Sequence, residues 1–183
     1  MIYHSSLHTA GLVLGICLLL LSVASLVRPT LSQNLARQLP RSRVAGVVLF
    51  SLAFLWTLWL LSTMEMGEFS SFRRPLLIGL PIGFVLVLRF LGEFLAVRAL
   101  GILCLLAAEP LIEAAFLRYE PSRLVVTVFA YLLVIAGLFW VTMPYLLRDQ
   151  INWTARSNGR WQFVNAIGFL YGAVTLVLAV TQY

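Results

Sequence analysis

Charged side chains are scarce in this sequence. Only 11% of its 183 residues are Asp, Glu, Lys or Arg, whereas soluble globular domains carry about 25%. There is no Lys, so all 13 basic residues are Arg, and Asp149 is the only Asp. Because so little charge cannot cover the surface of a water-soluble domain, we expect the chain to lie in a membrane.

The same scarcities exclude several classes of active site. Without Lys the chain has no Schiff-base lysine and no Ser–Lys dyad. His4 and His8 are the only histidines, and both precede the apolar part of the first span. There is therefore no mid-membrane pair for haem and no HExxH zinc motif. The two histidines could hold a metal at the outer surface, but a polar terminus is the simpler interpretation. We expect neither a metal nor a cofactor.

Long apolar runs are what the sequence has in abundance. Hydrophobic residues make up 61% of the chain, and residues 9–27, 44–64, 124–147 and 161–183 contain no charged residue. A bilayer core about 30 Å thick needs about 20 apolar helical residues. We therefore predict an all-α fold, a polytopic bundle of about six transmembrane helices in a single domain, residues 1–183. The expected spans are 7–27, 44–64, 75–91, 96–117, 124–147 and 161–181. Cys17 and Cys104 lie inside these spans and are expected to behave as small apolar residues.

The third and fourth spans are less sharply defined than the others. Arg89, Glu93 and Arg98 interrupt the apolar pattern, and Gly92 is the expected turn. A single long tilted helix here, with an extension along the membrane surface, would give five spans instead of six. The 44 residues 75–118 are too many for one crossing, which favours six.

Arginine is distributed unequally between the two sides of this predicted bundle. Loops one, three and five hold nine Arg residues, and loops two and four hold four. The nine are Arg28, Arg37, Arg41, Arg43, Arg89, Arg98, Arg148, Arg156 and Arg160. The four are Arg73, Arg74, Arg118 and Arg123. The positive-inside rule then predicts that both termini lie outside the cytoplasm. Because the arginines sit at helix ends, we expect no binding to nucleic acid.

The first loop, residues 28–43, has a helical pattern of its own. Leu31, Leu35 and Leu39 recur at a spacing of four, which places them on one helix face. Such a segment could be a short amphipathic helix on the cytoplasmic membrane surface. A plain polar loop with three leucines is the alternative, and the sequence leaves both open.

Three Gly-xxx-Gly pairs occur in the predicted spans. They are Gly11 with Gly15, Gly79 with Gly83, and Gly168 with Gly172. Each pair puts two glycines on one helix face and lets a neighbouring backbone approach closely. We expect these contacts to form within the bundle, with oligomerisation as the alternative. Pro81, Pro110 and Pro144 are expected to kink or weaken their helices locally.

The polar residues that most need a reason are Glu109 and Glu113. Glu109 lies about 13 residues into the predicted fourth span, where a charged acid costs about 2.5–3.5 kcal/mol. Glu113 follows one helical turn later, so both carboxyl groups share one face. They are the candidate ion or proton site. Two alternatives stay open: Glu109 as a hydrogen-bonding contact between helices, and a shifted span that leaves both acids near the outer surface with Arg118.

With no catalytic group in evidence, the sequence favours a small non-enzymatic inner-membrane protein. Its expected partners are the lipid bilayer and other membrane-protein subunits, for which it would act as a subunit or scaffold. The alternative is a small transporter or permease component that uses Glu109 and Glu113 for proton or cation coupling. An intramembrane enzyme acting on lipid, with Glu109 as base, is a third interpretation.

Overall fold

The computed structural model describes residues 6–64, 67–90 and 94–182, and every regular element within them is helical. Six helices are long and apolar enough to cross a membrane. They are α1 (Leu7–Val27), α3 (Arg43–Thr63), α4 (Arg73–Phe90), α5 (Leu95–Ala115), α6 (Arg123–Thr142) and α8 (Asn158–Thr181). Four short helices are α2 (Pro29–Gln38), η1 (Leu39–Arg41), η2 (Gly67–Phe72) and α7 (Tyr145–Thr154). The all-α fold and the six spans are confirmed, and the chain is an integral membrane protein.

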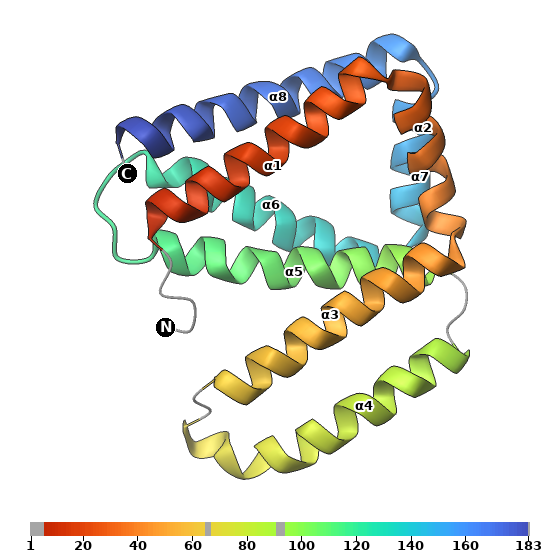
Figure 1. Ribbon diagram of the computed structural model, residues 1–183, viewed down its shortest axis with the longest axis vertical. Coiled ribbons are helices and arrows are strands. Elements are labelled where there is room, and N and C mark those ends of the chain that lie inside the picture. Colours follow the sequence, from red (N-terminus) through yellow and green to blue (C-terminus); the bar gives the residue numbers. More distant parts are fainter. Residues whose placement is uncertain (1–5, 65–66, 91–93, 183) are drawn as a thin grey trace.

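The long helices form two tight pairs and one looser edge. Helix α1 packs along α8, and α5 packs along α6. Helix α3 leans on α5, and α4 lies beside α3 at the edge of the molecule (Figure 1). The short helices α2 and α7 run across one end of the bundle, whereas the start of α1 and the end of α8 lie at the other (Figure 1). The connections of α1 to α3 and of α6 to α8 therefore lie at the same end.

Helix α6 is shorter than the span predicted for residues 124–147. It ends at Thr142, and the separate helix α7 begins at Tyr145. Pro144 directly precedes α7, so it separates two helices. Our expectation that it would kink a continuous helix was wrong. Proline has no backbone N–H and disfavours a helical conformation in the residue before it, here Met143. Pro81 and Pro110, by contrast, lie inside α4 and α5.

The first loop contains a helix, α2, and is not a plain loop. Pro29 occupies its first turn, where the missing N–H costs nothing. The Arg37 guanidinium donates a 2.6 Å hydrogen bond to the carbonyl of Ala155, which follows α7. Leu31 and Leu35 are 53% and 59% exposed. The helix is thus tied to α7 on one side and leaves two leucines uncovered. Gly92, the turn expected between α4 and α5, lies outside the described residues, as does His4.

Glycine contacts hold α1 against α8. A Cβ on Gly172 would lie 2.9 Å from the Cβ of Leu18 and 3.2 Å from the carbonyl oxygen of Gly15. A Cβ on Gly168 would lie 2.9 Å from the Ser22 hydroxyl oxygen. The two backbones therefore touch, which no larger residue would allow. Gly11 is also buried on α1. The pairs Gly11 with Gly15 and Gly168 with Gly172 therefore pack against each other within the chain.

The third glycine pair behaves differently, and our expectation for it was wrong. A Cβ on Gly79 or on Gly83 would meet no atom within 4 Å. No residue of α4 is buried in the isolated chain. The helix is attached to α3 mainly through Phe84, whose ring stacks on Phe50 and Phe54 at centroid distances of 5.3 and 4.3 Å. The glycine face of α4 is left without a close neighbour in the described part of the chain.

Candidate functional site

Helix α5 carries both candidate acids, but not at the middle of the span. It runs from Leu95 to Ala115, so its middle lies at Leu105. At about 1.5 Å rise per residue, Glu109 lies about 6 Å and Glu113 about 12 Å beyond that middle. Half of a bilayer core is about 15 Å. With α5 centred in the bilayer, Glu109 lies inside the core but off its centre, and Glu113 lies close to its surface.

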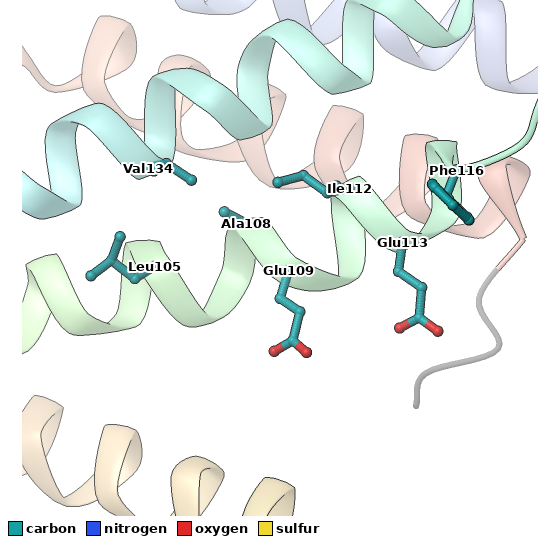
Figure 2. A pocket seen from close by; sticks show the side chains of 7 residues that line it. All are labelled: Leu105, Ala108, Glu109, Ile112, Glu113, Phe116 and Val134. Atoms are coloured by element: carbon teal, nitrogen blue, oxygen red, sulfur yellow. The ribbon is translucent and has the colours of Figure 1, made fainter. Parts of the chain in front are cut away.

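The two carboxyl groups line one cavity. Figure 2 shows both side chains leaving α5 in the same direction, one helical turn apart. Both are partly buried. The cavity has a volume of about 520 Å³ and an otherwise apolar lining. Its lining residues are Leu105, Ala108, Glu109, Ile112, Glu113, Phe116 and Val134. The shared helix face expected from the sequence therefore opens into a space large enough for a small ligand or part of a lipid.

A second cavity continues the first toward the end of α5. Its volume is about 440 Å³, and Ile112 and Phe116 line both cavities. Arg118 and Arg123 line the second one, together with Thr127 and other residues from the start of α6. We call the two cavities together the α5–α6 groove. Glu109 and Glu113 line its first cavity, and Arg118 and Arg123 line its second.

The arginines of this groove were missed as site residues. From the sequence we assigned Arg118 and Arg123 only to the fourth loop. Arg118 was also named as a neighbour of the acids in one alternative. The available signal is helix periodicity: Leu124, Thr127, Tyr131 and Val134 recur every three or four residues and share one face of α6. In the structure this face lines the groove.

A third cavity lies on another face of α5 and has a different character. It is about 460 Å³ in volume and is bordered by α1, α3, α5 and α6. Trp56, Pro110 and Cys17 contribute to a lining that contains no charged side chain. The charged candidate residues therefore belong to the α5–α6 groove alone.

Within residues 6–64, 67–90 and 94–182, no group of three His, Cys, Asp or Glu side chains is arranged to hold a metal ion. Comparison of the chain with protein-family models, with curated proteins and with solved structures finds no match.

Proposed function

We propose that the chain is a non-enzymatic subunit or scaffold of a larger membrane complex, and that α4 is the helix that contacts its partner. The observation that carries the proposal is the open glycine face of α4. Gly79 and Gly83 give a helix the close-approach surface that membrane helices use to pair. No atom of the described chain lies where their side chains would be.

The space beside α4 supports the same proposal. A cavity of about 280 Å³ lies between α4, α3 and α5, and its lining includes Gly83, Thr57 and Ile102. In a well-packed protein such voids are few, because each removes dispersion contacts. A side chain from a partner helix would supply those contacts. We therefore place the partner helix against α4.

The proposed location is the bacterial cytoplasmic membrane, with α2 and α7 on the cytoplasmic side and both termini outside. The unequal numbers of arginine residues support this orientation. Helices α2 and α7 lie at the same end of the bundle, opposite the start of α1 (Figure 1), so the first and fifth loops are on one side of the membrane.

To test the proposal, the chain is extracted from its native membranes in mild detergent. The mass of the extracted complex is then measured by native mass spectrometry. Wild type is expected to carry a partner subunit. The double variant Gly79→Leu, Gly83→Leu is expected to lose that partner while its unfolding temperature is unchanged or raised, since space exists for both side chains. Gly172→Leu is the contrasting control, because it should unfold the chain itself.

Two results would contradict the subunit proposal. One is a wild-type chain that is a bare monomer after gentle extraction. The other is a double variant that keeps its partner with unchanged affinity.

Proton or cation coupling is the second candidate function. It is favoured by one observation: Glu109 and Glu113 leave α5 in the same direction and line the same cavity (Figure 2). Two carboxyl groups so placed can share a proton or hold a cation between them. The substitution that tests this candidate is Glu109→Gln.

A further inference from the structure

The end of the molecule that carries α2 and α7 has a large excess of positive charge. Residues 28–43 and 143–160, which connect the long helices there, contain seven Arg residues and a single acid, Asp149. Asp149 is already paired with its neighbour Arg148 at 3.0 Å. Within the described part of the chain, the other arginines of these two segments form no ion pair. Their charge is therefore available to a ligand from outside the chain.

Helices α2 and α7 form one surface with the turn that leads into α8. They lie across the same end of the bundle (Figure 1). The Arg37 guanidinium donates a 2.6 Å hydrogen bond to the Ala155 carbonyl. The Gln33 amide donates a 3.3 Å hydrogen bond to the side-chain oxygen of Asn158. We call α2, α7 and the turn as far as Arg160 the α2–α7 platform.

The platform also exposes apolar and aromatic side chains. Leu31 and Leu35 share one face of α2 and are 53% and 59% exposed. Tyr145 and Trp153, near the two ends of α7, are 48% and 58% exposed. Trp and Tyr concentrate where the hydrocarbon of a bilayer meets its head groups. Short helices that expose both apolar and basic side chains are typical of segments that lie along the membrane surface.

One contact sets the depth of the positive charge. The Arg160 guanidinium carbon lies 5.0 Å from the centre of the Trp153 ring, which is a cation–π distance. A tryptophan at the membrane surface lies at the level of the lipid head groups. The guanidinium held against its ring is therefore at the level of the lipid phosphates.

Three arginines are gathered at this turn between α7 and α8. Arg156 and Arg160 belong to the turn and the start of α8, and both are exposed. Arg37 reaches the turn from α2 through its hydrogen bond to Ala155. That bond uses one of the five N–H groups of a guanidinium. Arginine binds phosphate through two parallel hydrogen bonds, so the turn has the donors that a phosphate group requires.

The sign of the charge selects among phospholipids. A zwitterionic head group brings an ammonium group close to its phosphate, and the arginines repel that ammonium. An anionic head group has no such group. Basic residues at a membrane surface accordingly attract anionic lipids.

We propose that the α2–α7 platform lies on the membrane surface and binds anionic phospholipid, with the phosphate of one head group at the turn between α7 and α8. Arg156 and Arg160 bind this phosphate, and Arg37 holds α2 beside it. Leu31 and Leu35 lie among the upper parts of the acyl chains. The proposal does not depend on the partner proposed for α4.

The first test measures lipid binding to the delipidated full-length chain by native mass spectrometry. The probes are phosphatidylglycerol and phosphatidylcholine with identical acyl chains. Phosphatidylglycerol is expected to bind about 5-fold to 25-fold more tightly, because each of the two arginines contributes about fivefold. Equal affinities would show only annular lipid and would overturn the proposal. Glycerol phosphate should not displace the lipid, because it has no acyl chain; displacement would show a site for a soluble compound and would also overturn it.

Variants locate the phosphate. Arg156→Gln and Arg160→Gln should each lower the affinity for phosphatidylglycerol about fivefold. Arg74→Gln is the matched control, because it removes one exposed arginine at the start of α4, away from the platform (Figure 1). Equal losses in the control would mean that affinity follows net charge alone. That result, or full affinity in both test variants, would refute the site. Thermal unfolding identifies a misfolded variant, and the other test variant then decides the result.

The depth of α2 separates a membrane surface from a surface that faces a soluble acidic partner. Leu35→Cys is spin-labelled in nanodiscs that contain phosphatidylglycerol, in a chain whose free Cys17 and Cys104 are replaced by Ala. The label is expected to collide with oxygen more often than with a water-soluble nickel complex, because oxygen concentrates in hydrocarbon. Thr30→Cys, on another face of the same helix and also exposed, is the control and should favour nickel. A nickel preference at residue 35 would place this face in water, would point to an acidic macromolecule as its partner and would overturn the lipid proposal.

Discussion

The carbonyl oxygen of Gly101 lies 2.8 Å from the position that a Cβ on Gly137 would occupy. The relation is reciprocal, since a Cβ on Gly101 would lie 2.9 Å from the carbonyl oxygen of Gly137. Helices α5 and α6 therefore touch through their backbones at this point. The walls of the α5–α6 groove depend on this contact, because it fixes the distance between the two helices.

Gly137→Ala is therefore expected to lower the free energy of unfolding by about 1–3 kcal/mol, the usual cost of overpacking. The added methyl group meets backbone and cannot be relieved by rotating a side chain. Equilibrium unfolding in detergent measures the effect. Gly159→Ala is the control: only the Ser157 hydroxyl oxygen, at 3.8 Å, approaches its Cβ position. Equal stability of the two variants would contradict the close contact.

Membrane orientation is tested with reporter fusions. Alkaline phosphatase fused at residue 183 should be active, and the same enzyme fused at Arg37 should be inactive, because α2 is expected on the cytoplasmic side. The reverse pattern would show that the bundle is inserted the other way round. Inactivity at both positions would place the C-terminus on the same side as loop one and would indicate five spans.

The hydrogen bond from Arg37 to the carbonyl of Ala155 joins α2 to the end of α7. Arg37→Ala is expected to raise the amide exchange rates of α2 about fivefold to tenfold, since a hydrogen bond to an exposed charged group stabilises by about 1 kcal/mol. Arg41→Ala removes a charge from the neighbouring turn without removing this bond. Unchanged exchange in the Arg37 variant would mean that other contacts hold α2 in place.

Glu109→Gln separates a structural acid from one that handles protons or cations. Glutamine keeps the size and the hydrogen-bonding capacity of the side chain but cannot titrate. We expect the variant, alone and combined with Glu113→Gln, to unfold within about 2 °C of wild type, as substitutions outside a packed core usually do. We also expect partner binding to persist. Proton or cation flux that is present in wild-type liposomes and absent in a folded Glu109→Gln protein would establish the transport function instead.

The spans were predictable because membrane burial leaves a strong signal. The charge-free runs 9–27 and 44–64 correspond to α1 and α3 almost residue for residue. The end of α6 was not predictable in the same way. Pro144 lies inside an apolar run, and hydrophobicity alone does not distinguish a helix that continues from one that turns along the membrane surface.

The packing contacts were predicted less well, for a physical reason. A Gly-xxx-Gly pair shows that a helix can be approached closely, but not which helix approaches it. Gly168 and Gly172 meet α1, whereas Gly79 and Gly83 meet nothing in the described chain. Conversely, Gly101 belongs to no such pair and yet touches Gly137. The sequence signal for this contact is the spacing of seven residues between Gly101 and Ala108. Both are small and both are buried on α5.

The groove was predicted only in part. Helical spacing was enough to place Glu109 and Glu113 together, because that relation is local. Their depth required the ends of α5, and the arginines at the outer end required the position of α6. Such relations depend on tertiary structure, which one sequence does not display.

The pairing of α1 with α8 also has a consequence for biosynthesis. The 130 residues 28–157 separate the two helices, and at about 5–20 residues per second their synthesis takes on the order of 10 s. During that time the Gly11 and Gly15 face of α1 has no α8 to cover it. It must be covered by lipid, by the insertion machinery or by another protein. Assembly of this bundle is therefore completed only after α8 has entered the membrane, and a chain stopped before α8 would expose a helix-pairing surface to every neighbour.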